Sequence, residues 1–169
     1  MKYVSLQATI TLTEWSERTI RRRIADGTLP YTDSLTVVEG GGQNKTMIGF
    51  EAIKNAICIP LEEEDIALIK EADTGDASAQ NDLAILFLEH HKPKSAIYWL
   101  ELSVKQNFAD AMQHLGNCYL KGEGVSKDHN LAIMWIAKAA SLGHAIADQQ
   151  IKSLLSLGKF SETLAPLVD

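Results

Sequence analysis

Residues 109–145 carry the sequence ADAMQHLGNCYLKGEGVSKDHNLAIMWIAKAASLGHA, and this stretch decides the fold. Small and large apolar residues recur three and four positions apart at its two ends, which is typical of helices that bury one face. Gly122 and Gly124 stand between these ends, where they permit loop conformations that are costly for other residues. Gly143 follows the second apolar segment and can end a helix. The stretch therefore predicts a helix, a glycine-containing loop and a second helix.

The same pattern recurs on both sides of this stretch. Segments that open with two alanines two positions apart begin at Ala77, Ala109 and Ala145, so the repeat lengths are 32 and 36 residues. The motif Ala-Ile-x-Trp also occurs twice and aligns Trp99 with Trp135. The four-residue difference lies in the loop between the two helices of each unit. The chain therefore contains repeated helix-loop-helix units, which stack to bury a shared core.

The fuller unit resembles the SEL-one-like repeat, a relative of the tetratricopeptide repeat. The resemblance rests on Ala111, Leu115, Gly116, Tyr119, Gly122, Gly124, Val125, Asp128, Ala132, Trp135, Lys138, Ala139, Ala140 and Gly143. It covers roughly residues 62–158, although the first unit has Ala84 in place of the first-helix glycine and lacks the Gly-x-Gly loop. The resemblance implies an α-α superhelical repeat module that acts as an interaction scaffold and is not an enzyme.

A tetratricopeptide-like register also implies where a protein or peptide partner would bind. The first helices of such a stack line its concave side. The groove-facing positions are then Ser78, Asn81, Ile85, Asp110, Gln113 and Asn117. Side-chain amides at such positions can hydrogen-bond the backbone of an extended peptide. Because the surroundings are acidic, we expect the partner segment to be basic.

The N-terminal part has a different pattern, centred on WSERTIRRRIADGTLP at residues 15–30. Ser5 and Ser16 are suited to cap two short helices. Ile20 and Ile24 lie one turn apart on the second helix and are expected to face inward. The segment SLTVVEGGGQNKTMIGF, at residues 34–50, predicts two strands around a glycine-rich turn, and an amphipathic helix follows.

This order of elements resembles the excisionase and MerR-type winged helix-turn-helix domain, whose second helix enters the DNA major groove. The residues that the resemblance assigns to double-stranded DNA are Arg18, Thr19, Arg21, Arg22 and Arg23 on the helix, with Lys45 and Thr46 at the hairpin tip. Two positions depart from the family pattern. Thr9 and Ile10 replace a pair of small residues, and Glu14 replaces a glycine in the turn.

The distribution of charge also favours two domains, at residues 1–60 and 61–169. The net charge of the chain is -6, but residues 1–60 carry seven basic and six acidic side chains, whereas residues 61–169 carry nine and sixteen. No apolar run approaches the length of a membrane span. The distant Cys58 and Cys118 do not have metal-ligand spacing, and no cofactor motif is present. We therefore expect a reduced, cytoplasmic protein without cofactor or metal.

Two functions remain open at this point. In the first, the chain is a DNA-binding regulator or DNA-tethered adaptor, and the repeats hold a protein partner. In the second, it is a protein-interaction scaffold whose winged domain does not bind DNA. The basic helix is then a solvated face, or the acidic repeat half occupies it. We further expect a homodimer, joined either through the ends of the stack or through residues 153–168, SLLSLGKFSETLAPLV.

Overall fold

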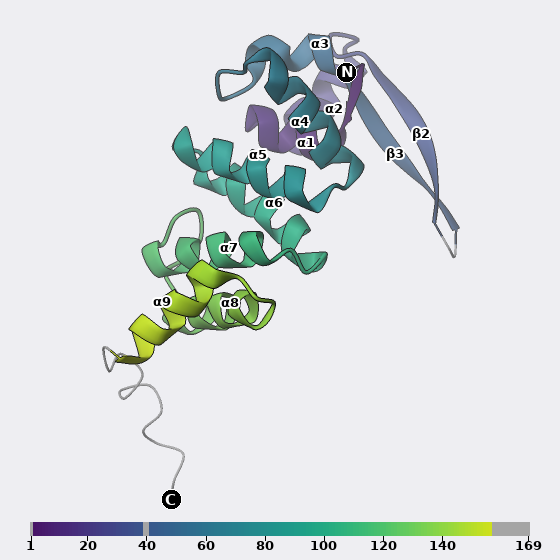
Figure 1. Ribbon diagram of the computed structural model, residues 1–169. Helices are drawn as coiled ribbons and strands as arrows, with labels where there is room; N and C mark the ends of the chain where they lie inside the picture. The colour runs from purple at the N-terminus through teal and green to yellow at the C-terminus, as the bar shows by residue number, and fades with distance from the viewer. Residues whose placement is uncertain (1, 39–40, 157–169) are drawn as a thin grey trace, which may run out of the picture.

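The computed structural model describes residues 2–38 and 41–156, and it consists of a small mixed unit followed by a stack of helices (Figure 1). The N-terminal unit comprises β1 (Tyr3–Ser5), α1 (Leu6–Thr13), α2 (Glu17–Ala25), β2 (Tyr31–Val38), β3 (Gly41–Gly49), α3 (Phe50–Ile53) and the short 3-10 helix η1 (Lys54–Ala56). The stack comprises α4 (Glu63–Thr74), α5 (Ala77–Glu89), α6 (Pro93–Lys105), α7 (Ala109–Lys121), α8 (His129–Ser141) and α9 (Ala145–Ser156). The chain is therefore mainly helical, as predicted.

Two serines start the helices of the N-terminal unit. The hydroxyl of Ser5 accepts a hydrogen bond from the backbone N–H of Ala8, and the hydroxyl of Ser16 accepts one from Thr19. Both predicted N-caps are confirmed. Glu14 ends α1 with φ at 56°, the left-handed conformation in which a glycine is usual. The chain therefore adopts this tight turn without the glycine that the resemblance led us to expect.

The three strands form an antiparallel sheet in the order β1-β3-β2. Strands β2 and β3 make a long hairpin that projects from the unit (Figure 1). Their pairing runs from Tyr31 opposite Ile48 to Val38 opposite Gly41. Lys45 and Thr46 therefore lie within β3 and not at the hairpin tip, so their predicted position was wrong. The helix that follows the hairpin is also shorter than expected, because α3 has only four residues before η1 begins.

The repeat helices begin and end close to where the sequence places them. α5 and α6 form the first unit, α7 and α8 the second, and α9 begins at the third pair of alanines. Gly116 allows α7 and α8 to approach, because a Cβ at this position would lie 2.5 Å from Cγ1 of Ile136. Trp99 is buried and Trp135 is half-buried against the core, so both of the aligned tryptophans pack within the stack.

The loop of the second unit reaches back to the first. Gly124 has a φ of 75°, as expected for a glycine in this loop. A Cβ there would also lie 2.5 Å from the carbonyl oxygen of Pro93, at the start of α6. The Gly-x-Gly loop thus contributes to contact between repeats in addition to linking two helices.

The N-terminal unit packs directly on the first repeat, and buried residues of both belong to one hydrophobic core. The hydroxyl of Ser95 on α6 donates to the carbonyl oxygen of Thr11 at 2.8 Å. Lys92 and Glu14 form an ion pair at 2.6 Å across the same junction. These contacts fix the C-terminal end of α1 against the stack.

Candidate functional site

The predicted partner-binding residues do not share one exposed surface. Ser78 and Asp110 are exposed, and Ile85 and Asn117 are half-buried. Asn81 and Gln113 are buried, with exposed fractions of 3% and 6%. The expectation that these two amides face an open groove is therefore corrected.

Both buried amides instead connect one repeat to the next. Oδ1 of Asn81 lies 3.0 Å from Nδ1 of His114, and Nε2 of Gln113 donates to Oε1 of Gln150 at 2.9 Å. Gln150 also donates to Oδ1 of Asn117. The Asn81–His114 and Gln113–Gln150 contacts are equivalent, because each joins the fifth residue of a unit's first helix to the sixth residue of the next unit's first helix. Burial demands such partners, because an unpaired amide away from water is unfavourable.

His114 is held in its neutral form by these surroundings. Burial lowers the pKa of His114, while the carboxylate of Asp110 opposes this effect and the nearby ring of His144 adds to it. Because Asn81 presents its oxygen, Nδ1 of His114 carries the proton in this contact. His144 caps α9 by accepting from the backbone N–H of Ala147, and its Nε2 lies 3.2 Å from Asp110. Both contacts join first helices of successive units, α5 with α7 and α7 with α9.

An open groove lies between the first helices of the second and third units. It has a volume of about 340 Å³ and is lined by Leu120 on α7 and by Ile146, Gln149, Gln150, Ser153 and Leu154 on α9. Ile146 is 60% exposed at the N-terminal end of α9. An exposed aliphatic side chain beside an unfilled apolar groove is a feature of partner-binding surfaces.

The sequence interpretation missed the α9 side of this groove. Ile146 and Gln149 both belong to the third alanine-started segment, on which the sequence analysis placed no partner-binding residue. The repeat register contained the necessary signal, because Gln149 is equivalent to Gln113 and Asn81. Gln149 lies on the last helix of the described residues and is exposed.

The basic residues of α2 fall into two groups. Arg21 forms an ion pair with Glu17 at 2.6 Å, and the guanidinium of Arg23 lies 4.1 Å from the centre of the Trp15 ring. Arg18 and Arg22 are exposed, and neither has an ion-pair partner within residues 2–38 and 41–156. Over the same residues, no ion pair joins α2 to the repeats. Ile20, on the same helix as these arginines, is buried in the core, as predicted.

The remaining residues of the predicted DNA surface have internal partners. The hydroxyl of Thr19 lies 2.9 Å from that of Ser16, and the hydroxyl of Thr46 donates to Asp33 across the hairpin. Nζ of Lys45 lies 3.9 Å from the carboxylate of Asp73 on α4. Lys45 therefore points toward the repeat stack, whereas Arg18 and Arg22 lie free on α2.

The described part of the chain contains no cluster of three His, Cys, Asp or Glu side chains arranged for a metal ion. No helix within it is long and apolar enough to cross a membrane. Cys118 is buried in α7 as a small apolar side chain, and burial raises the pKa of its thiol to about 11. The predicted dimer segment beyond Ser156 lies outside the described residues.

Comparison with known proteins identifies the repeats. The model of the Sel1 repeat family matches residues 77–108 and 109–144, which are the two units α5–α6 and α7–α8. The DAP3-binding cell death enhancer 1 of Rattus norvegicus is 29% identical over 101 residues, which cover 58% of this chain and 20% of that protein. The Mus musculus protein of the same name is 30% identical with the same coverage. The chain thus spans about a fifth of the length of these curated relatives.

Two solved structures are similar to the stack. A protective antigen of uropathogenic Escherichia coli with an SLR fold, c5321, is 31% identical with a TM-score of 0.54 over 58% of this chain and 22% of that one. A Sel1 repeat protein from Oxalobacter formigenes is 30% identical with a TM-score of 0.51 over 57% of this chain and 76% of that one. Both support the helical-repeat architecture.

Proposed function

Because this chain carries two Sel1 repeats, at residues 77–108 and 109–144, we propose that it is a non-enzymatic protein-interaction scaffold whose partner binds in the groove between α7 and α9. The observation that carries the proposal is the position of Ile146, which is 60% exposed beside that groove. The amides of Gln149 and Gln150 lie next to it and can hydrogen-bond the backbone of a bound segment.

The chemistry of the groove indicates the kind of segment that fits. Leu120, Ile146 and Leu154 offer an apolar contact for one or two aliphatic or aromatic side chains. Residues 61–169 carry sixteen acidic and nine basic side chains, so a basic segment is favoured over an acidic one. The relatives named above are DAP3-binding proteins, which supports partner binding as the general role of such repeats without identifying the partner here.

Quantitative partner capture with matched variants tests this proposal. Ile146→Arg places a charge in the groove and should remove a defined subset of captured proteins. Met134→Arg makes the same change at another exposed apolar residue, on α8 and outside the groove, and should leave that subset unchanged. Equal capture by both variants and the wild type would exclude the α7–α9 groove as the binding site.

We propose DNA binding by the N-terminal unit as a second candidate function. The specific observation in its favour is that Arg18 and Arg22 lie one turn apart on α2 and are exposed without an ion-pair partner in the described chain. A helix-turn-helix followed by an antiparallel hairpin is the context in which winged domains insert their second helix into a groove. The contacts of α1 with α6 leave this face of α2 uncovered.

Titration of full-length protein onto duplex DNA tests the second function. Changing Arg18 and Arg22 to alanine should weaken binding by roughly 1–3 kcal/mol for each arginine that contacts a base. For each arginine that contacts a phosphate, the slope of the logarithm of the binding constant against the logarithm of the salt concentration should instead decrease by about one. The control changes Lys94 and Lys105, which are exposed on α6, and removes the same charge elsewhere. Similar binding by both double variants would rule out α2 as the DNA-binding element.

A further inference from the structure

A row of polar side chains runs from the α7–α9 groove across the first helices of the stack to α5. Asp82, His114 and Gln150 are the sixth residues of α5, α7 and α9, so the repeat places them on the same face of three successive helices. Asn81 donates to Asp82 at 3.1 Å and lies 3.0 Å from His114, which links the first two positions of the row. Gln150 lines the groove at one end of the row, and Asp82 stands at the other end.

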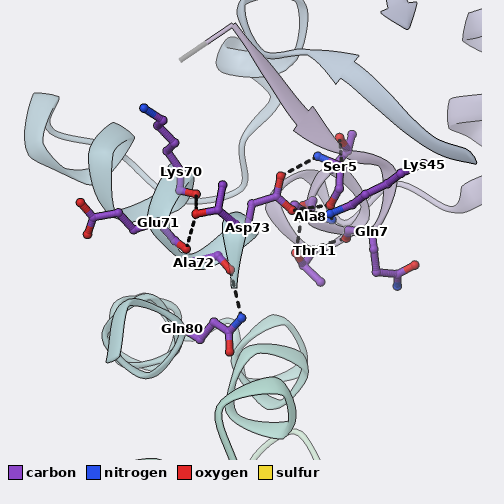
Figure 2. Close-up of polar contacts among 12 residues, drawn as sticks. Ser5, Gln7, Ala8, Thr11, Lys45, Lys70, Glu71, Ala72, Asp73 and Gln80 are labelled. Atoms are coloured by element: carbon purple, nitrogen blue, oxygen red, sulfur yellow. Dashed lines mark hydrogen bonds and ion pairs between the residues drawn. The ribbon is translucent and has the colours of Figure 1, made fainter. Parts of the chain in front are cut away.

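Asp82 points away from the junction with the N-terminal unit. Gln80, on the same helix, points toward α4 and donates to the carbonyl oxygen of Ala72 (Figure 2). Two residues turn an α-helix by about 200°, so Asp82 lies on nearly the opposite side of α5. Burial lowers the pKa of His114, and the carboxylate of Asp82 is one of the charges that oppose this effect. Asp82 therefore lies near the His114 ring, on the face that carries the row.

The carboxylate of Asp82 is accessible and has no cation beside it. The side chain is exposed, and it forms no ion pair with any side chain that the structure describes. It accepts a hydrogen bond from the amide of the neighbouring Asn81, and a carboxylate has the capacity to accept several more. Asp110, by contrast, already faces Nε2 of His144 at 3.2 Å. A basic side chain that crosses this face therefore meets an unpaired carboxylate at Asp82.

We propose that the partner is an extended segment that places an aliphatic or aromatic side chain in the α7–α9 groove and an arginine or lysine on Asp82. This inference rests on the proposed function and specifies the partner of the same site. Packed neighbouring helices lie about 8–10 Å apart, so two steps separate the α5 and α9 positions by about 16–20 Å. An extended chain rises about 3.3 Å per residue, so the apolar and basic residues of the partner are about five or six positions apart.

Peptide selection tests both the charge and the spacing. A library of random 16-residue peptides displayed on phage is selected on the immobilised full chain. We expect the wild type to enrich peptides with an apolar and a basic residue about five or six positions apart. Asp82→Lys should enrich an acidic residue at the basic position, because the charge that this position meets is reversed. Glu101→Lys reverses an exposed charge on α6, the second helix of the same unit, and should enrich the same peptides as the wild type.

A charge swap in solution makes the assignment quantitative. The best wild-type peptide is synthesised with its basic residue and with glutamate in its place, and the affinity of each is measured by fluorescence polarisation. Asp82→Lys should weaken binding of the basic peptide by at least roughly tenfold. The same variant should bind the glutamate peptide more tightly than the wild type does, which also shows that the variant is folded.

The inference and the proposed function fail in different ways. If Ile146→Arg enriches the same peptides as the wild type, the groove is not the binding site and both are overturned. A wild type that enriches no peptide and sediments as a dimer assigns the groove to a second copy, with the same consequence. If Ile146→Arg loses the apolar position but Asp82→Lys keeps the basic one, only the assignment of Asp82 is overturned. A spacing of about 11–13 positions indicates a helical partner and overturns the extended segment.

Discussion

Nδ1 of His114 lies 3.0 Å from Oδ1 of Asn81, and the two residues come from the first helices of successive repeats. The contact between Gln113 and Gln150 occupies the equivalent place one repeat later. These polar pairs lie within an apolar stack, where a side chain of different length or charge leaves a buried polar group without its partner. They therefore specify the register of neighbouring units.

The His114 contact makes stability depend on pH. Burial lowers the pKa of His114 in the folded chain below its ordinary value of 6.5, so protonation favours the unfolded chain. The stabilisation is complete above pH 6.5 and decreases as the pH falls below that value. We expect the free energy of unfolding, measured with urea from pH 7.5 to pH 5, to decrease less in His114→Gln than in the wild type.

The control for this measurement is His129→Gln, which changes an exposed histidine at the start of α8. Its pH dependence should match that of the wild type. If His114→Gln loses stability on acidification as steeply as the wild type does, another group causes the pH dependence and the neutral state assigned to the half-buried His114 is wrong.

Gly116 provides a second test, through helix packing. A Cβ there would lie 2.5 Å from Cγ1 of Ile136 and 3.0 Å from the carbonyl oxygen of Ala132, so a methyl group forces α7 and α8 apart. We expect Gly116→Ala to reduce the free energy of unfolding by roughly 1–3 kcal/mol, despite the better helix propensity of alanine. Ser78→Ala, at an exposed position of α5, should change it by no more than about 0.5 kcal/mol in urea denaturation.

The repeat fold could be predicted because its signals are local and periodic. Paired alanines, the Ala-Ile-x-Trp motif and the loop glycines recur at regular offsets, and each reflects a packing or backbone requirement within one unit. The caps at Ser5 and Ser16 are local in the same sense. Such features do not depend on how distant segments meet.

The predicted groove failed for a physical reason that a single unit does not reveal. The register places Asn81 and Gln113 on the first helices, but their burial depends on how closely the next unit approaches. The junction with the N-terminal unit was equally hidden, because Ser5 and Asp73 are 68 residues apart and no local pattern relates them. Lys45 was predicted at the hairpin tip because the glycine-rich segment was taken as the turn. Strand pairing instead continues through this segment to Val38 opposite Gly41, so Lys45 lies within β3.

The loop glycines allow two causes of destabilisation to be separated. Gly122 and Gly124 both have positive φ values, at 79° and 75°, so alanine at either position is strained by roughly 1–2 kcal/mol. Only at Gly124 would the new Cβ also meet the carbonyl oxygen of Pro93, at 2.5 Å. We expect Gly124→Ala to cost about 1–3 kcal/mol more than Gly122→Ala in urea denaturation. Equal losses would show that the loop does not pack against α6.

The last prediction concerns the contact between Ser5 and Asp73, which joins β1 to α4. The Ser5 hydroxyl has two roles, because it accepts from the Ala8 N–H to cap α1 and donates to the Asp73 carboxylate. Ser5→Ala alone combines both losses, so a double-mutant cycle with Asp73→Ala is needed to isolate the contact between the two halves. We expect a coupling free energy of about 0.5–3 kcal/mol from urea denaturation.

Ser16 caps α2 in the same way and makes no contact with Asp73. The cycle of Ser16→Ala with Asp73→Ala should therefore be additive within about 0.5 kcal/mol. If both cycles are additive, the Ser5 hydroxyl does not stabilise the junction through Asp73, and the remaining contacts, such as the Ser5 backbone N–H with Asp73 and Ser95 with Thr11, must hold the two halves together.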